Sequence, residues 1–376
     1  MKAKLLFASD TCPIGINTDP FVQGATDVLL GDLADTFSSA DYRVINLECP
    51  LTDSQTPIPK VGPNLSAPTA AVSGFKAMGI DLVTLANNHI MDHGAEGLYS
   101  TLNALDNAGI NNIGAGKNLN EAYRMQEVVK NGHRIGILAL AEQEFNTATL
   151  TSPGSSRIDI IDFIRIMAAK RKELDSLIVI LHAGSEHHPY PSPNTQRVSR
   201  FMVEQGASAV ICQHTHCIGS MEIYKGAPII YGQGNFLFDY LYKNLSWRIG
   251  ILVLLTILDD GKIEPEIIPY KQNLGTPGVR RLDDDENLQV LEAFRGRSNE
   301  TLDEMVVEQR WRDYCLSRRQ SYMRTLRGVP GVAGKLLSFP LISKYLDTHK
   351  VQRQRLGVIR CESHREAIQT LLDQEQ

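Results

Sequence analysis

The sequence lacks long apolar runs, paired-cysteine motifs and a strong excess of either charge. The apolar window 249–258 has about half of the roughly 20 residues that a membrane-spanning helix needs. The apolar stretch after Met1 is too short for a secretory signal. The six cysteines show no CxxC spacing, so we expect reduced thiols rather than a disulfide framework. These absences predict a cytoplasmic protein without a transmembrane segment.

The net charge of −5 is small, but it is unevenly distributed. Residues 291–376 contain 15 Lys/Arg and 11 Asp/Glu, whereas the first 290 residues contain 23 and 32. We interpret the basic C-terminal part as a solvated helical surface, with contact to a polyanion or an anionic membrane as the alternative. No recognisable nucleic-acid-binding motif accompanies the charge, so we expect no nucleic-acid partner.

Short apolar segments alternate with amphipathic segments over the first two-thirds of the chain. This rhythm predicts a largely parallel sheet covered by helices. Strands are predicted at 4–9, 44–47, 81–86, 134–140, 177–181, 209–212 and 228–231, and helices at 70–78, 97–107, 160–173 and 194–205.

The rhythm changes near residue 247. Segments 247–258 and 262–271 are joined by Asp259-Asp260-Gly261, which predicts a β-hairpin and therefore some antiparallel pairing. After Gly275 we expect no further strand, and Thr301 with Glu304 matches a capping box at the start of a helix. We predict a main domain at 1–275 and a helical C-terminal region at 276–376.

Polar side chains follow five of the predicted strands at their C-terminal ends. In open α/β sheets these ends form the crevice where ligands bind, so we expect the side chains to meet. Seven of the ten histidines lie in or beside these segments. The residues are Asp10 after the first strand, Glu48 after the second, Asn88 and His89 after the third, His182 and Glu186 after the fifth, and His214 and His216 after the sixth.

Carboxylates and imidazoles that converge in a buried site without a cation face desolvation and mutual repulsion. We therefore predict a metal site. Carboxylate, amide and imidazole ligands are typical of a site for Mn²⁺, Fe²⁺/Fe³⁺ or Zn²⁺. A structural cysteine–zinc site would need paired thiolates instead. Two such ions bridged by a carboxylate can orient an attacking water and neutralise charge on a phosphoryl group.

The same segments resemble the motif series of calcineurin-like metallophosphoesterases, and more closely the CapA/PgsA family of capsule and poly-γ-glutamate synthesis proteins. The resemblance covers about residues 3–240 and is expected to extend to 271. It implies an α/β fold, a four-layer α/β/β/α sandwich with two mixed sheets, to which a C-terminal helical appendage is added. The matching motifs are NLECPLT at 46–52, LANNHIMDHG at 85–94, HAGSE at 182–186, HTH at 214–216 and YGQGNF at 231–236.

The resemblance also implies individual roles. His89 is expected to donate a proton to the leaving group, a task that suits an imidazole. Glu186 is expected to act in catalysis or substrate contact, and Asn235 as a metal ligand or a residue that supports one, with a purely structural role as the alternative for both. The expected metal ligands are Asp10 and His216 for one ion, Asn88, His182 and His214 for the other, and Glu48 as the bridge.

Two positions depart from the phosphoesterase pattern. Cys12 stands where those enzymes have a histidine, and it is either a thiolate ligand or a packed, inert thiol. Glu48 stands where they have an aspartate, so the bridging carboxylate is one methylene longer. Either change can weaken one of the two metal sites.

Three functions fit these residues. The first is a metallophosphoesterase-like hydrolase that acts on a small phosphorylated compound or a polymeric anionic intermediate of surface-polymer synthesis. The second is a metal-dependent amide hydrolase or transferase that acts on a γ-glutamyl-type polymer. The third is a non-catalytic accessory protein of capsule or polyglutamate biosynthesis, which binds the polymer or a biosynthetic partner protein.

Overall fold

Apolar side chains point to both faces of the buried strands. In β1 (Ala3–Cys12), Leu5 and Phe7 pack into one core, whereas Leu6 and Ala8 pack into a second core on the opposite face. Because side chains alternate along a strand, such a strand must be covered on both faces. The computed structural model describes residues 2–240, 245–329, 331–337, 339, 342, 348–361, 363–365, 367–368 and 372.

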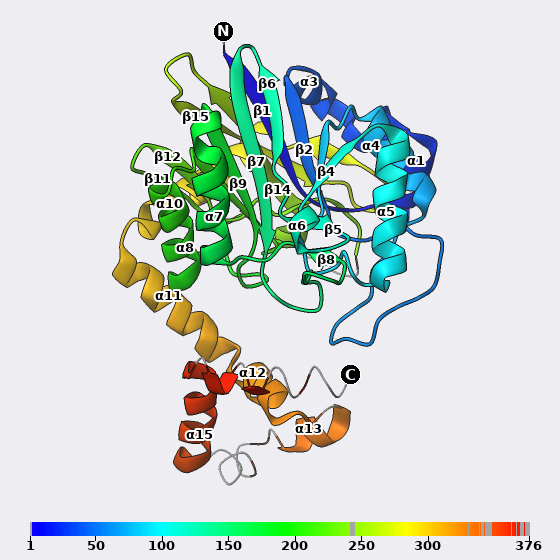
Figure 1. Cartoon of the computed structure of the whole chain (residues 1–376). Helices are drawn as coiled ribbons and strands as arrows, with labels where there is room; N and C mark the ends of the chain where they lie inside the picture. The colour runs from blue at the N-terminus through cyan, green and yellow to red at the C-terminus, as the bar shows by residue number, and fades with distance from the viewer. Residues whose placement is uncertain are drawn as a thin grey trace. The chain divides into compact units, whose positions relative to one another are not determined.

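Two mixed β-sheets lie face to face in the first compact unit, Met1–Trp311 (Figure 1). In the first sheet β1 is parallel to β2 and antiparallel to β14, and the C-terminal part of β1 is also parallel to β13. The order is β16 (Val279–Arg281), β15 (Ile263–Gln272), β14 (Ile249–Ile257), β1, β2 (Tyr42–Leu47), β3 (Leu82–Thr84) and β4 (Asn111–Ile113), with β13 (Asn235–Phe238) paired to β1.

The second sheet has a parallel centre and antiparallel edges. β7, β9, β10 and β12 are parallel neighbours, and β6 and β11 pair antiparallel to β7 and β12. The order is β11 (Met221–Tyr224), β12 (Ala227–Ile230), β10 (Ala209–Gln213), β9 (Ser176–His182), β7 (His133–Ala141) and β6 (Gln126–Lys130), and β5 (Ala115–Gly116) pairs separately with β8 (Gly154–Ser155).

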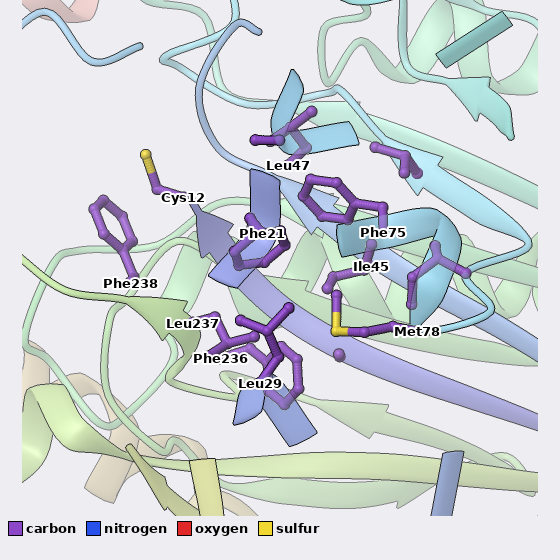
Figure 2. Packing of buried hydrophobic residues seen from close by; sticks show 14 of the residues in the cluster. Cys12, Phe21, Leu29, Ile45, Leu47, Phe75, Met78, Phe236, Leu237 and Phe238 are labelled. Atoms are coloured by element: carbon purple, nitrogen blue, oxygen red, sulfur yellow. The ribbon is translucent and has the colours of Figure 1, made fainter. Parts of the chain in front are cut away.

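Helices cover the outer face of each sheet. On the first sheet, Phe21 of α1 and Phe75 of α4 contact each other in a core that also contains Ile45 of β2 (Figure 2). On the second sheet, Phe163 of α7 and Met202 of α8 pack against residues of β7, β9 and β10. The covering helices are α1 (Thr18–Gln23), α2 (Thr26–Leu30), α3 (Ala34–Ser38), α4 (Val72–Ala77) and α5 (Gly94–Ala108) on the first sheet, and α7 (Ile160–Lys170) and α8 (Pro193–Glu204) on the second.

These layers confirm the predicted four-layer α/β/β/α sandwich with two mixed sheets. The hairpin is also confirmed, because β14 and β15 pair antiparallel from Ile257 and Ile263 onward, and Gly261 adopts the positive φ of 81° that the turn requires. Shorter helices are α6 (Leu119–Ala122) and α9 (Leu245–Arg248).

Two expectations for the C-terminal third are wrong. Strands do not stop at Gly275, because β16 extends the first sheet by pairing with β15. Thr301 does not cap a helix; it is the buried last residue of α10 (Asp284–Thr301), and its hydroxyl donates to Ser220 Oγ at 2.8 Å. At the start of the next helix, α11 (Glu304–Ser317), the Met305 backbone N–H donates to Asp303 Oδ1 and not to Thr301.

The second compact unit, Arg312–Gln376, is helical where the structure describes it. It contains the end of α11, then α12 (Arg319–Arg327), α13 (Gly331–Leu337) and α15 (His349–Arg360). The helical appendage is confirmed, whereas the boundary between domains at residues 275 and 276 stays a prediction. Among the described residues, no helix combines the length and apolar content that crossing a bilayer requires.

Candidate metal centre

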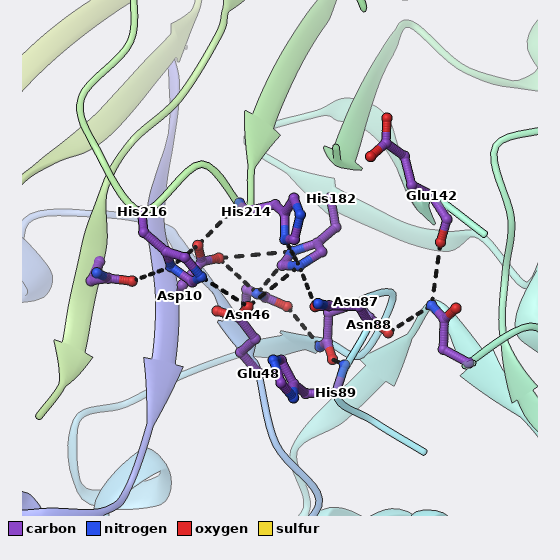
Figure 3. A network of polar contacts seen from close by, with 12 residues as sticks. Asp10, Asn46, Glu48, Asn87, Asn88, His89, Glu142, His182, His214 and His216 are labelled. Atoms are coloured by element: carbon purple, nitrogen blue, oxygen red, sulfur yellow. Dashed lines mark hydrogen bonds and ion pairs between the residues drawn. The ribbon is translucent and has the colours of Figure 1, made fainter. Parts of the chain in front are cut away.

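The C-terminal ends of strands from both sheets meet at one place. β1, β2 and β3 run parallel in the first sheet, and β9 and β10 run parallel in the second. Because parallel strands end at the same edge, the polar residues that follow them lie together (Figure 3). Six of the predicted ligands form one buried cluster: Asp10, Glu48, Asn88, His182, His214 and His216.

Glu48 lies at the centre of this cluster. Both of its carboxylate oxygens are buried, and neither has a hydrogen-bond partner among the described residues. His182 Nε2 and His216 Nε2 lie 3.5 and 3.7 Å from Glu48 Oε1. Burial raises the pKa of Glu48 well above its usual value, and the nearby Asp10 carboxylate adds to this effect. A buried carboxylate without partners is costly, and a bound cation would remove that cost.

The three histidines of the cluster are buried and favour the neutral form. Burial lowers the pKa of His214 to about 4, and it lowers the pKa of His182 and His216 well below the usual value. His182 Nε2 lies 3.0 Å from both His214 Nδ1 and Asn88 Oδ1. Neutral imidazoles have a lone pair to donate, which is the form that binds metal.

Glu48, His214 and His216 have ligand atoms that all lie within 4.8 Å of one another. A carboxylate oxygen and imidazole nitrogens at this separation are the donor set of Zn²⁺, Mn²⁺ or iron sites. These three residues could therefore hold a single divalent cation or contribute to two neighbouring ones. The carboxylate and imidazole donors, and the lack of a hydrogen-bond partner for Glu48 among the described residues, both fit a bound cation.

Asp10 is held from both sides by its neighbouring strands. In register it lies opposite Asn46 of β2 and Asn235 of β13. Asn46 Nδ2 donates to Asp10 Oδ1 at 2.8 Å, and the His214 backbone N–H donates to Asp10 Oδ2 at 3.0 Å. Burial raises the pKa of Asp10 to about 7 despite these bonds. The bond from His214 joins the two sheets at the cluster.

Backbone strain is concentrated at this edge. His214 and His216 have φ values of 88° and 51°, and His187 has a φ of 60°. Residues other than glycine rarely adopt this left-handed region, which costs of order 1–3 kcal/mol per residue and is common at functional sites. The turn after β10 thereby directs two imidazoles and one backbone N–H toward the first sheet.

His89 lies beside the cluster in a separate buried contact. Its Nδ1 is 2.7 Å from Asp92 Oδ2, and Lys60 Nζ bonds Asp92 Oδ1 and lies 3.2 Å from His89 Nδ1. Asp92 also accepts the Leu65 backbone N–H at 2.6 Å. When Nδ1 carries a proton it donates to Asp92, and the contacts of Asp92 and Lys60 with Nδ1 leave Nε2 for other partners.

The other predicted residues lie outside the ligand cluster. Asn235 Oδ1 is 2.7 Å from His216 Nδ1, so Asn235 supports that ring. Glu186 is exposed and close enough to Glu48 to raise its pKa. Cys12 is buried in the apolar core of the first sheet, where burial raises the pKa of its thiol well above the usual value, which opposes a thiolate (Figure 2).

Three residues that shape the site were not expected from the sequence. Lys60 comes from an irregular loop without any periodic pattern. Asn46 bonds Asp10; it begins the motif at 46–52 and is a polar residue inside an apolar strand, but neither signal assigned it a role. Trp247 of α9 is buried, and its ring lies 4.6 Å from that of His216 between centroids.

The sandwich and its carboxylate–histidine cluster define a metallophosphoesterase-type fold. Within that class the chain belongs to the family described as bacterial capsule synthesis protein PGA_cap, whose model matches residues 13–240.

Curated relatives agree with this family. The chain is 28% identical to the capsule biosynthesis protein CapA of Bacillus anthracis, over 67% of this chain and 63% of that protein. It is 27% identical to the PGA biosynthesis protein CapA of Bacillus subtilis (strain 168), over 69% of each chain. The match thus spans less than two-thirds of the Bacillus anthracis protein.

Solved structures include more distant matches. A 5′-nucleotidase precursor from Thermus thermophilus is 12% identical with a TM-score of 0.43, over 78% of this chain and 58% of that one. The NAD nucleotidase of Haemophilus influenzae is 12% identical with a TM-score of 0.41, over 84% of this chain and 60% of that one.

Proposed function

We propose that this chain is a metal-dependent hydrolase of a phosphate ester that is formed or consumed in surface-polymer synthesis. The observation that carries the proposal is Glu48, a fully buried carboxylate without a hydrogen-bond partner among the described residues, which faces three neutral imidazoles. Packing alone does not account for a buried carboxylate here, because an apolar side chain of the same size would fill the space without the desolvation cost.

Two metal ions, Mn²⁺, Fe²⁺/Fe³⁺ or Zn²⁺, are the proposed cofactors. Asp10 and His216 would hold the first ion, Asn88, His182 and His214 the second, and Glu48 both. When bound, the ions supply Lewis-acid activation of water and neutralise charge on the phosphoryl group. Asn46 and Asn235 support this set by fixing Asp10 and the His216 ring.

His89 is the proposed proton donor to the leaving group. Asp92 accepts from Nδ1, which orients the ring so that Nε2 is the atom that carries the transferred proton. Lys60 balances the charge of Asp92 in a pair whose side chains are 3% and 1% exposed. Glu186, exposed beside Glu48, is the proposed contact for the rest of the substrate.

Space for the organic part of a substrate lies next to His216. Trp247 and Phe238 both contact the His216 ring, with centroid distances of 4.6 and 5.8 Å. The same two side chains line a cavity of about 400 Å³ together with Tyr240 and Arg248. The Asp239 carboxylate also lines this cavity, so its aromatic side chains, one guanidinium and one carboxylate suit a polar compound that carries a ring.

Turnover of a panel of phosphomonoesters and phosphodiesters by protein loaded with Mn²⁺ or Zn²⁺ tests the proposal. We expect phosphate or alcohol release by the loaded protein, and none by the chelated protein or by Asp10→Ala. Asp285→Ala, which removes an exposed carboxylate of α10, is the matched control. Full occupancy by metal without turnover of any ester would contradict hydrolysis of phosphate esters.

The names of the relatives favour a second candidate. They assign two of these proteins to capsule and PGA biosynthesis, and a relative 32% identical over half of this chain is named for an accessory role in polyglutamine synthesis. The same centre could cleave or transfer an amide of a γ-glutamyl-type polymer, or the chain could bind polymer or a partner protein without catalysis. Mass spectrometry of polymer products, with phosphate release measured in parallel, separates these functions.

A further inference from the structure

The second compact unit, Arg312–Gln376, has the opposite charge from the rest of the chain. It contains 12 Lys/Arg and 6 Asp/Glu, a net charge of +6, whereas residues 1–311 contain 26 and 37, a net charge of −11. An anionic surface would attract the second unit and repel the first. Charge alone, however, does not distinguish a lipid surface from an acidic polymer.

Among its described residues, this unit leaves many apolar side chains exposed. Within its described residues, no large apolar side chain is buried, and eleven are exposed. The first unit, nearly five times as long, exposes fifteen among its described residues. The helices α12, α13 and α15 have 9, 7 and 12 residues, lengths at which an isolated helix in water is marginal without packing. An apolar surface outside the unit would supply the missing packing.

Six of these eleven exposed apolar residues form pairs on one side of α12, α13 and α15. Tyr322 and Leu326 on α12, and Val332 and Leu336 on α13, are four residues apart, and Leu356 and Ile359 on α15 are three apart. Residues at these spacings lie on the same helix face.

Basic side chains border each apolar pair. Arg319 precedes Tyr322 by three residues, Lys335 follows Val332 by three, and Arg353 precedes Leu356 by three. All three basic residues are exposed. Helices that combine an apolar face with a Lys/Arg border bind at the interface of a bilayer with anionic headgroups.

We propose that the second compact unit docks on the surface of a bilayer that contains anionic phospholipid. A bilayer surface offers apolar cover and negative charge together. An acidic polymer offers the charge without the apolar cover, and the acidic first unit of a second copy exposes fewer apolar side chains for its length. The proposal does not depend on the hydrolase function.

Flotation of the full chain with vesicles tests this docking. We expect the protein to float with vesicles of phosphatidylcholine and phosphatidylglycerol in equal amounts, to bind phosphatidylcholine vesicles at least about tenfold more weakly, and to be released by salt. Arg319→Gln with Arg353→Gln should weaken binding about 25-fold, at roughly fivefold per basic residue. Leu326→Ser with Leu336→Ser should weaken it similarly.

The matched control is Lys117→Gln with Leu150→Ser, which removes an exposed cation and an exposed apolar side chain from the first unit. It should bind as the wild type does. Equal binding to both kinds of vesicle, no binding, or an equal loss in the control would overturn the proposal. A dimer in sedimentation that dissociates in Leu326→Ser with Leu336→Ser, without vesicle binding, would assign the face to a second copy and would also overturn it.

Discussion

The two compact units of this chain differ in which side chains they bury and which they expose. The first unit, Met1–Trp311, buries its apolar residues in three cores and also buries Asp10, Glu48 and His182 at the edge of its sheets. The second unit, Arg312–Gln376, exposes its apolar residues and its basic ones alike where the structure describes it. Chemistry is therefore to be sought inside the first unit, and contacts with other surfaces on the second.

The largest expected effect concerns a buried polar residue of the first unit. His89→Gln should lower turnover of a phosphate ester about 10²–10⁴-fold, because it removes a group that donates a proton in the reaction. Metal content should stay unchanged, since His89 lies beside the ligand cluster rather than in it. Steady-state kinetics and elemental analysis of the same preparation measure both quantities.

His133→Gln is the control for this prediction. His133 begins β7, is partly exposed and has no part in the cluster. An equal loss of turnover in both variants, or wild-type turnover in His89→Gln, would show that the histidine beside the cluster has no special role in the reaction.

The second effect is stabilisation by metal. Mn²⁺ or Zn²⁺ at about 1,000 times its dissociation constant should raise the free energy of unfolding by about 4 kcal/mol, because the folded state alone binds it. Glu48→Gln should lose most of this gain, since it removes the carboxylate that is the proposed ligand of both ions. Thermal unfolding with and without chelator checks the expectation, and Glu96→Gln, an exposed carboxylate of α5, is the control.

Without metal, the size of the Glu48→Gln effect on stability depends on pH. Burial raises the pKa of Glu48, so the folded protein binds this proton more tightly than the unfolded chain does. The stabilisation from this proton is present at low pH and is lost as the pH rises above the ordinary glutamate range. Chelated Glu48→Gln should therefore exceed the wild type in stability at about pH 8, and the difference should shrink toward about pH 5. A difference independent of pH would contradict the burial of an ionisable carboxylate.

Much of the fold could be predicted because both sheets are buried on two faces. Strands such as β9 are then continuous apolar runs bounded by polar residues, and the sequence marks them clearly. β16 could not be predicted, because three residues at a sheet edge are too short to show a period. Thr301 and Glu304 match a local capping pattern. In the structure, however, α10 continues to Thr301, whose hydroxyl bonds to the distant Ser220.

The candidate site could be predicted in part for a related reason. Residues directly after a buried strand have a position fixed by the sheet, so Asp10, Glu48 and His214 could be expected to meet. Lys60 could not be expected, because its place beside His89 depends on the path of an irregular loop. No spacing in the sequence encodes such a path.

Lys60 offers the third test of the buried polar region. Lys60→Met leaves Asp92 buried with only the His89 ring and the Leu65 N–H among its described partners. Breaking a buried pair in this way should lower the free energy of unfolding by about 2–3 kcal/mol. Urea denaturation measures the change; Lys60→Arg should restore part of it, and exposed Lys117→Met should cost less than about 0.5 kcal/mol.

The smallest expected effect is that of Leu336→Ala in the second unit, which we compare with the substitution of a buried leucine in the first unit. Leu181 of β9 is 1% exposed, whereas Leu336 of α13 is 51% exposed. Leu181→Ala should cost about 3–5 kcal/mol, from lost burial and the remaining cavity. Leu336→Ala should change the free energy of unfolding by less than about 0.5 kcal/mol, because it removes no buried contact. Urea denaturation of both variants measures this, and a cost above about 2 kcal/mol for Leu336→Ala would show that the second unit buries this side chain in solution.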